Sequence, residues 1–208
     1  MNRYVQFSQK KIFDGNSKFK TSVIPTGNWR GMVMNTERAP FDNPKVRKAV
    51  RLAVDRQELV DTVMGGEAVV SCDTPVAPTD QYRHNMSCKQ NIAEAKKLLK
   101  EAGYPNGIEM VIHVSTKEPT WPTIAEVIQQ QVAKAGIKVD IKMTPSKSYW
   151  KETWMKKDVA MTRWNERSAD SVLHEVYHSS AKWNESYYKS SDFDKNLADA
   201  RGELDFTK

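Results

Sequence analysis

Long apolar runs are absent from this sequence of 208 residues, in which 28% of the residues are charged and 39% are hydrophobic. A helix that crosses a bilayer needs about 20 consecutive apolar residues, so a membrane-spanning helix is excluded. The first twenty residues, MNRYVQFSQKKIFDGNSKFK, also lack the continuous apolar core of a secretory signal peptide. We therefore expect either a cytoplasmic protein or a chain whose beginning is missing.

Cysteine is scarce, with two residues in the whole chain, Cys72 and Cys88. Both fall in one segment rich in Asp, Pro, Ser and Asn, so a disulfide between them would close a loop and stabilise the fold by about 3 kcal/mol in an oxidising compartment. Two free thiols fit the sequence equally well. Because there is no CxxC pattern and His84 is the one histidine nearby, the pair makes a poor metal site.

Clustered positive charge is also missing, although the net charge is +6. The lysines alternate with acidic residues, as in KKLLKEAG at 96–103 and WKETWMKKD at 150–158. This mixture is typical of solvated helix faces, whereas a surface that binds nucleic acid gathers Lys and Arg on one side. We therefore expect no nucleic-acid partner.

Common catalytic motifs are absent as well: GxSxG, the P-loop and GxGxxG do not occur. The exception is HEVYH at 174–178. On a helix, His174 and His178 would share one face and could bind Zn²⁺, with Glu175 as the base that activates a bound water, so a zinc metallopeptidase is the alternative hypothesis. Three fixed positions are a weak signal, and the metzincin continuation with a third histidine is missing. We expect no enzyme activity and no cofactor.

Apolar periodicity and turn residues predict an alternation of strands and helices. Asn43 and Asn91 are predicted helix caps, with Pro44 at the first position of the first of these helices. The segment 67–90 shows no clear periodicity and is predicted to be a long ordered loop. Strands are expected at 29–35, 108–115, 137–143 and 159–165, and helices at 44–53, 55–64, 91–102, 121–135 and 148–157. This order predicts an α/β fold, a mixed sheet covered by helices.

Several stretches together carry a resemblance to a known family. They are PFDNPKVRKAVRLAVDRQELVDTVMGGEA at 40–68, AKKLLKEAGYPNG at 95–107, the glutamine-rich helix that leads into AGIKVDI at 135–141, Trp164 through Trp183 and Asn184, and FDKNLADARGELD at 193–205. In order and spacing the region 29–208 resembles the extracytoplasmic solute-binding proteins of ABC importers, of the peptide and nickel type known as family 5.

The resemblance implies a type II periplasmic-binding-protein lobe of a two-lobed, hinged receptor. Residues 1–28 would be the exit segment from the other, missing lobe or part of the hinge. Residues 29–208 would form the ligand-binding lobe, truncated before the returning hinge strand. The implied partners are a small-molecule or peptide ligand and the permease subunits of an ABC transporter, and the implied protein is a periplasmic or otherwise extracytoplasmic monomer.

The ligand segment of the family is matched with one departure. In peptide-binding relatives a tryptophan at the end of a strand faces the cleft, and an aspartate three residues later pairs with the ammonium group of the peptide. Trp164 matches this tryptophan, but the third residue after it is Arg167. A guanidinium suits a carboxylate or phosphate, so we expect a ligand with an acidic group. Alternatively, Arg167 is a surface residue that pairs with Glu166 or Asp170.

Other polar and aromatic residues are weaker candidates for the same site. Trp29 and Trp183 could form apolar walls, and Asn165 and Asn184 could hydrogen-bond a ligand. A tryptophan in a sheet covered by helices is more often part of the core than a ligand platform.

Overall fold

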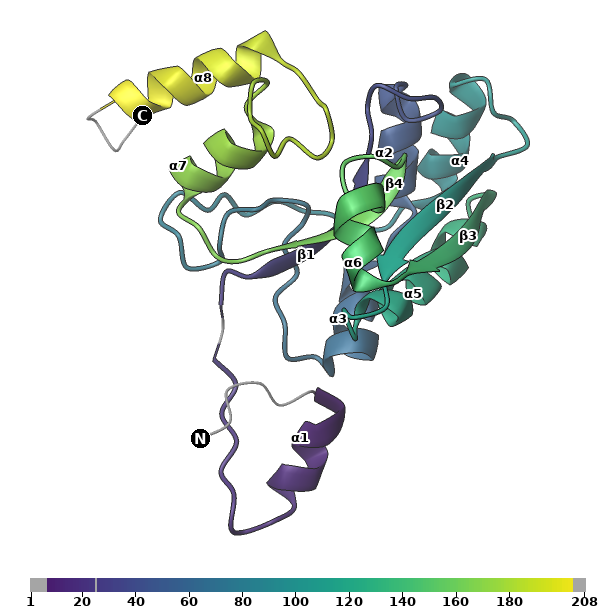
Figure 1. Ribbon diagram of the computed structural model, residues 1–208. Helices are drawn as coiled ribbons and strands as arrows, with labels where there is room; N and C mark the ends of the chain where they lie inside the picture. The colour runs from purple at the N-terminus through teal and green to yellow at the C-terminus, as the bar shows by residue number, and fades with distance from the viewer. Residues whose placement is uncertain (1–6, 25, 204–208) are drawn as a thin grey trace.

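The computed structural model describes residues 7–24 and 26–203 (Figure 1), and within them one mixed sheet contains β1 (Trp29–Met34), β2 (Ile108–Ser115), β3 (Ile137–Thr144) and β4 (Val159–Trp164). The strand order is β1-β4-β2-β3. β1 runs antiparallel to β4, and β2 is parallel to both β3 and β4. The predicted strands and the mixed sheet covered by helices are therefore confirmed.

The five predicted helices are present, but the helix at Phe7–Asp14 and two short π-helical turns were not predicted. The helices are α1 (Phe7–Asp14), α2 (Pro44–Leu52), α3 (Arg56–Met64), α4 (Ile92–Glu101), α5 (Trp121–Ala133), α6 (Ser146–Ser148), the π-helix η1 (Tyr149–Thr153), α7 (Ala169–Val172), the π-helix η2 (Leu173–Tyr177) and α8 (Ser191–Gly202). No helix in the described part of the chain is long and apolar enough to span a membrane.

Side-chain caps explain where three of these helices begin. The side chain of Asn43 accepts a hydrogen bond from the backbone N–H of Lys45, and Asn91 accepts one from Glu94. Asp55 starts α3 in the same manner, since it accepts from the backbone of the following turn. Each cap satisfies a backbone donor that has no partner within its helix, so the predicted caps are confirmed.

The apolar sides of α2, α4 and α5 share one core with the sheet. Val46, Ala49 and Val50 of α2 are fully or almost fully buried, as the helical spacing predicted. Side chains alternate between the faces of a strand, so the residues Val159 and Met161 of β4 face this core. Thr162 and Trp164 are alternate residues near the end of β4, and they contribute to the candidate site.

The segment between α3 and α4 forms no helix or strand, as expected, and is tied down by covalent and ionic contacts. Cys72 and Cys88 form a disulfide, which decides between the two alternatives that the sequence left open. Asp73 accepts hydrogen bonds from the guanidinium groups of Arg56 and Arg51. Burial raises the pKa of the Asp73 carboxyl, but the two arginines outweigh burial and hold the pKa below its ordinary value of 3.8.

Candidate ligand-binding site

Three tryptophans, Trp29, Trp164 and Trp183, meet where β4 ends, and we call them the tryptophan cluster. The antiparallel register places Trp29 opposite Trp164, and the two rings stack with centroids 6.5 Å apart. Trp183 reaches the cluster from the segment between η2 and α8, with its ring 5.7 Å from that of Trp164. All three are partly buried, so the cluster keeps an exposed apolar surface of the kind that small-molecule sites use.

Arg167 lies against the face of the central tryptophan. Its guanidinium carbon is 5.5 Å from the centre of the Trp164 ring, within the range of a cation–π interaction. Its Nη1 atom is 2.9 Å from a carboxylate oxygen of Glu175, and about a third of each side chain is exposed (35% and 33%). The sequence had suggested Glu166 or Asp170 as partners, but Asp170 pairs with Arg201. The ionic partner of Arg167 is therefore Glu175.

The two asparagines differ in their surroundings. Asn165 is exposed directly after Trp164. Asn184 is buried, and its amide donates to the backbone carbonyl of Tyr188 at 2.6 Å while its oxygen accepts from the hydroxyl of Ser186 at 3.0 Å. The polar atoms of Asn184 are therefore used to hold the turn that carries Trp183.

A buried carboxylate beneath the tryptophan cluster was missed by the sequence analysis. Glu185 is 7% exposed and accepts hydrogen bonds from Thr162 Oγ1 at 2.6 Å, from Trp164 Nε1 at 3.3 Å and from Trp154 Nε1. Burial raises the pKa of Glu185 above its ordinary value of 4.5, although the three hydrogen bonds favour the ionised form. Nothing in the pattern around WNES distinguishes this glutamate from a surface one.

The backbone between Trp164 and α7 is held from two sides. Asp80, in the loop closed by the disulfide, accepts a hydrogen bond from the backbone N–H of Ala169 at 2.9 Å, where α7 begins. Asn28 accepts one from the backbone N–H of Glu166 at 2.8 Å. The residues between Trp164 and α7 are thus fixed to the loop and to the chain that leads into β1, which limits how far Arg167 can move.

The zinc-site alternative finds no support. HEVYH falls mostly on η2, where the rings of His174 and His178 lie 5.1 Å apart. His174 Nδ1 is 3.1 Å from a guanidinium nitrogen of Arg201, a position that repels a metal cation. Glu175, the expected base, is paired with Arg167. Within residues 7–24 and 26–203, no three His, Cys, Asp or Glu side chains are grouped so that they could hold a metal ion.

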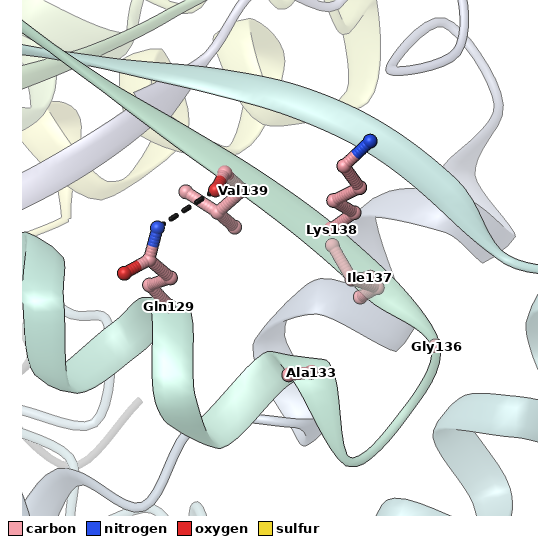
Figure 2. A pocket seen from close by; sticks show the side chains of 6 residues that line it. All are labelled: Gln129, Ala133, Gly136, Ile137, Lys138 and Val139. Carbon is pink, nitrogen blue, oxygen red and sulfur yellow. Dashed lines mark hydrogen bonds between the residues drawn. The ribbon is translucent and has the colours of Figure 1, made fainter.

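A shallow apolar hollow lies at the other edge of the sheet, between α5 and β3. Figure 2 shows Gln129 pointing from α5 to β3, where its amide donates to the backbone carbonyl of Val139 at 2.8 Å. The hollow is also lined by Ala133, Gly136, Ile137 and Lys138. Since β3 and β1 occupy opposite edges, this hollow is separate from the tryptophan cluster, and it offers one charged group for recognition.

The mixed sheet layered with helices is the fold of a type II periplasmic-binding-protein lobe. The chain belongs to the bacterial extracellular solute-binding proteins, family 5, because the model of that family's middle region matches residues 3–184. This confirms the resemblance seen in the sequence.

The chain is similar to proteins whose names give different ligands. The chain is 33% identical over 138 residues to the glutathione-binding protein GsiB of Pectobacterium atrosepticum and 32% identical to that of Escherichia coli K12, covering 66% of this chain and 27% of each relative. It is 27% identical to Helicobacter pylori DppA in complex with the peptide STSA, with a TM-score of 0.82 over 97% of this chain and 41% of that one. Campylobacter jejuni NikZ in complex with Ni(L-His) shares the fold at 20% identity, with a TM-score of 0.84 over 98% of this chain and 44% of that one.

The chain therefore spans about a quarter of the length of these curated relatives, 27%, and less than half of the solved structures, 41% and 44%.

Proposed function

We propose that this chain is the ligand-binding lobe of the substrate-binding component of an ABC importer, acting outside the cytoplasm and passing its ligand to the permease subunits. Residues 29–208 form the lobe, and residues 1–28 lead from a second lobe or hinge. The ligand is a small solute or peptide-like molecule bound between the lobes. Contacts made only in the closed state shift the population towards closure, so no chemical step is required.

The observation that carries this proposal is the tryptophan cluster at the end of β4 with the Arg167 guanidinium against Trp164. Aromatic walls with one charged group are typical of sites that bind small polar ligands. A guanidinium has five N–H donors, and Arg167 Nε is buried without a hydrogen-bond partner while Nη1 lies 2.9 Å from the Glu175 carboxylate. An acidic group of the ligand would bind the remaining donors, in competition with the Glu175 carboxylate.

The complete protein that carries this lobe should be expressed so that it is exported and then purified. Native mass spectrometry of that protein tests the proposal directly. An organic acid or phosphorylated solute that copurifies at one per chain would support it. One zinc ion per chain with no organic ligand would contradict it and favour His174 and His178 as a metal site.

Substitutions at the ion pair test the acidic-ligand specificity. We expect Arg167→Ala to weaken the binding of the acidic ligand by about tenfold to a hundredfold, because a charge-assisted contact is lost. Glu175→Gln should strengthen binding about threefold, since the competing carboxylate is removed and surface pairs are worth little by themselves. Calorimetric titration measures both changes.

Arg163→Ala is the matched control, because Arg163 also lies near the end of β4 and forms a similar 2.9 Å ion pair, with Glu118. Its affinity should equal that of the unmodified protein. Unchanged affinity for acidic ligands in Arg167→Ala would remove the proposed role of this guanidinium.

The apolar wall provides a separate test. Trp164→Ala should weaken ligand binding about 30-fold, a loss of about 2 kcal/mol, because the central ring of the cluster is removed. Trp150 is a partly exposed tryptophan that contacts Trp121 and Trp154 instead of the cluster. The control variant Trp150→Ala should therefore leave affinity unchanged. Both variants need a thermal melt beside the titration. If Trp164→Ala and Trp150→Ala both fold and bind the ligand with equal affinity, the tryptophan cluster does not contact the ligand.

A further inference from the structure

Glu185 is an unusual group because its carboxyl group is buried and, among the described residues, forms no ion pair. The residue is 7% exposed, and no Lys or Arg of residues 7–24 and 26–203 pairs with its carboxylate. An ionised carboxylate is costly to bury unless hydrogen bonds replace its water. Here the replacement comes from Thr162, Trp164 and Trp154, which donate to its two oxygens.

Because of the kind of donors that surround it, both terminal atoms of the Glu185 side chain must be hydrogen-bond acceptors. An indole N–H can only donate a hydrogen bond. Trp154 donates to Oε1 and Trp164 donates to Oε2, so each oxygen faces a group that cannot accept. A carboxylate satisfies both indoles, whereas an amide would direct its own N–H groups at one of them. This arrangement specifies a glutamate rather than a glutamine of the same size.

The hydrogen bond to Trp164 acts on the ring at the centre of the tryptophan cluster. Trp29 and Trp183 contact the ring of Trp164, and the guanidinium of Arg167 lies over its face. The N–H edge of the ring is the part that Glu185 holds. Since Thr162 precedes Trp164 by two residues on β4, the carboxylate also links the ring to the strand below it.

We propose that Glu185 is a positioning residue for ligand recognition, which orients the Trp164 ring before a ligand arrives. The ligand role of Trp164 in this inference rests on the proposed function. A tryptophan side chain that is already oriented loses less conformational freedom when a ligand binds. The hydrogen bond to Trp164 therefore increases affinity without contact between Glu185 and the ligand.

Nuclear magnetic resonance of the ligand-free chain tests the hydrogen bond independently of any ligand. With ¹⁵N-labelled tryptophan, the indole resonance of Trp164 is assigned from a Trp164→Phe variant. In Glu185→Gln we expect this resonance to move and its proton to exchange with solvent at least about tenfold faster, as the loss of a charge-assisted hydrogen bond predicts. Ligand affinity, measured on the complete protein, should fall about tenfold.

Glu152→Gln is the matched control, because Glu152 is exposed on η1 and the change removes the same charge. Its indole spectrum and affinity should equal those of the unmodified chain. An unchanged Trp164 resonance in folded Glu185→Gln would overturn the inference, and so would a shifted resonance with unchanged affinity. If the unmodified protein binds no ligand, the proposed function fails while the indole measurement still decides the hydrogen bond.

A titration of the unmodified chain decides the case if Glu185→Gln does not fold. The indole resonances of Trp154 and Trp164 should shift together with one apparent pKa above 4.5, because both donate to one carboxylate whose pKa is raised by burial. Independent titration of the two indoles, or no titration between about pH 4 and pH 8, would overturn the inference.

Other ionisable groups near the carboxylate do not produce this signature. Burial raises the pKa values of the Tyr149 and Tyr177 phenols, so both stay neutral in that range. Lys157 lines a small cavity together with Glu185, Trp154 and Thr162. His113 lies on the neighbouring strand, opposite Ala160, and burial lowers its pKa. Its own ring resonances, and a His113→Gln variant, separate its titration from that of Glu185.

Discussion

Replacing Gly107 by alanine should lower the free energy of unfolding by about 4 kcal/mol or more, which is a large fraction of the stability of an ordinary domain. Gly107 has a positive φ of +87°, and a Cβ atom there would lie 1.8 Å from the backbone oxygen of Gly136. The clashing atom belongs to the backbone just before β3, so a side-chain rotation cannot relieve the contact. Relief requires β2 and β3 to separate where their parallel pairing begins.

Gly103→Ala separates this clash from simple backbone strain. Gly103 also has a positive φ, +90°, but a Cβ atom at this position would meet nothing within 4 Å. Alanine in the left-handed region costs about 1–2 kcal/mol, so Gly103→Ala should remain folded. Urea unfolding of the two variants measures the difference. Equal losses of stability would show that the approach between residues 107 and 136 is not the cause.

The double variant Cys72→Ser, Cys88→Ser should lose about 3 kcal/mol of stability, because the disulfide restricts the unfolded chain over a separation of 16 residues. The loss should appear as a lower urea midpoint under oxidising conditions. Unmodified protein treated with a reductant should reach the same midpoint. If oxidised protein and variant unfold together, the disulfide contributes nothing to stability.

A functional effect should accompany this loss. The loop closed by the disulfide contains Asp80, whose carboxylate accepts from the backbone at the start of α7, two residues after Arg167. A loosened loop would release one of the two hydrogen bonds that hold the backbone between Trp164 and α7. We therefore expect weaker ligand binding in the cysteine variant as well.

The sequence was sufficient for the features that depend on near neighbours in the chain. Asn43 and Asn91 cap helices through backbone groups two or three residues away, and the buried side of α2 follows from helical spacing alone. Family resemblance then placed Trp164 at the end of a strand, where β4 does end. Both kinds of feature depend on short stretches of sequence, so both could be predicted.

The contacts that build the candidate site are long-range, and for that reason they could not be predicted. The three donors to Glu185 precede it by 21 to 31 residues and converge on it only after η1 and β4 have taken their places. Glu175 was assigned to the zinc hypothesis, since a five-residue pattern does not reveal that Arg167 lies across from it. One turn of π-helix at η2 determines the direction of this carboxylate, and no spacing rule predicted it.

The pairing of β1 with β4 has a consequence for how the chain acquires its structure. Met34 pairs with Val159 and Trp29 with Trp164, so the first strand must wait for the last before the sheet is complete. Closing so long a loop is entropically unfavourable, and folds rich in such distant contacts form slowly. The tryptophan cluster should therefore be among the last parts to assemble, and the quenching or shift of its fluorescence would mark the end of folding.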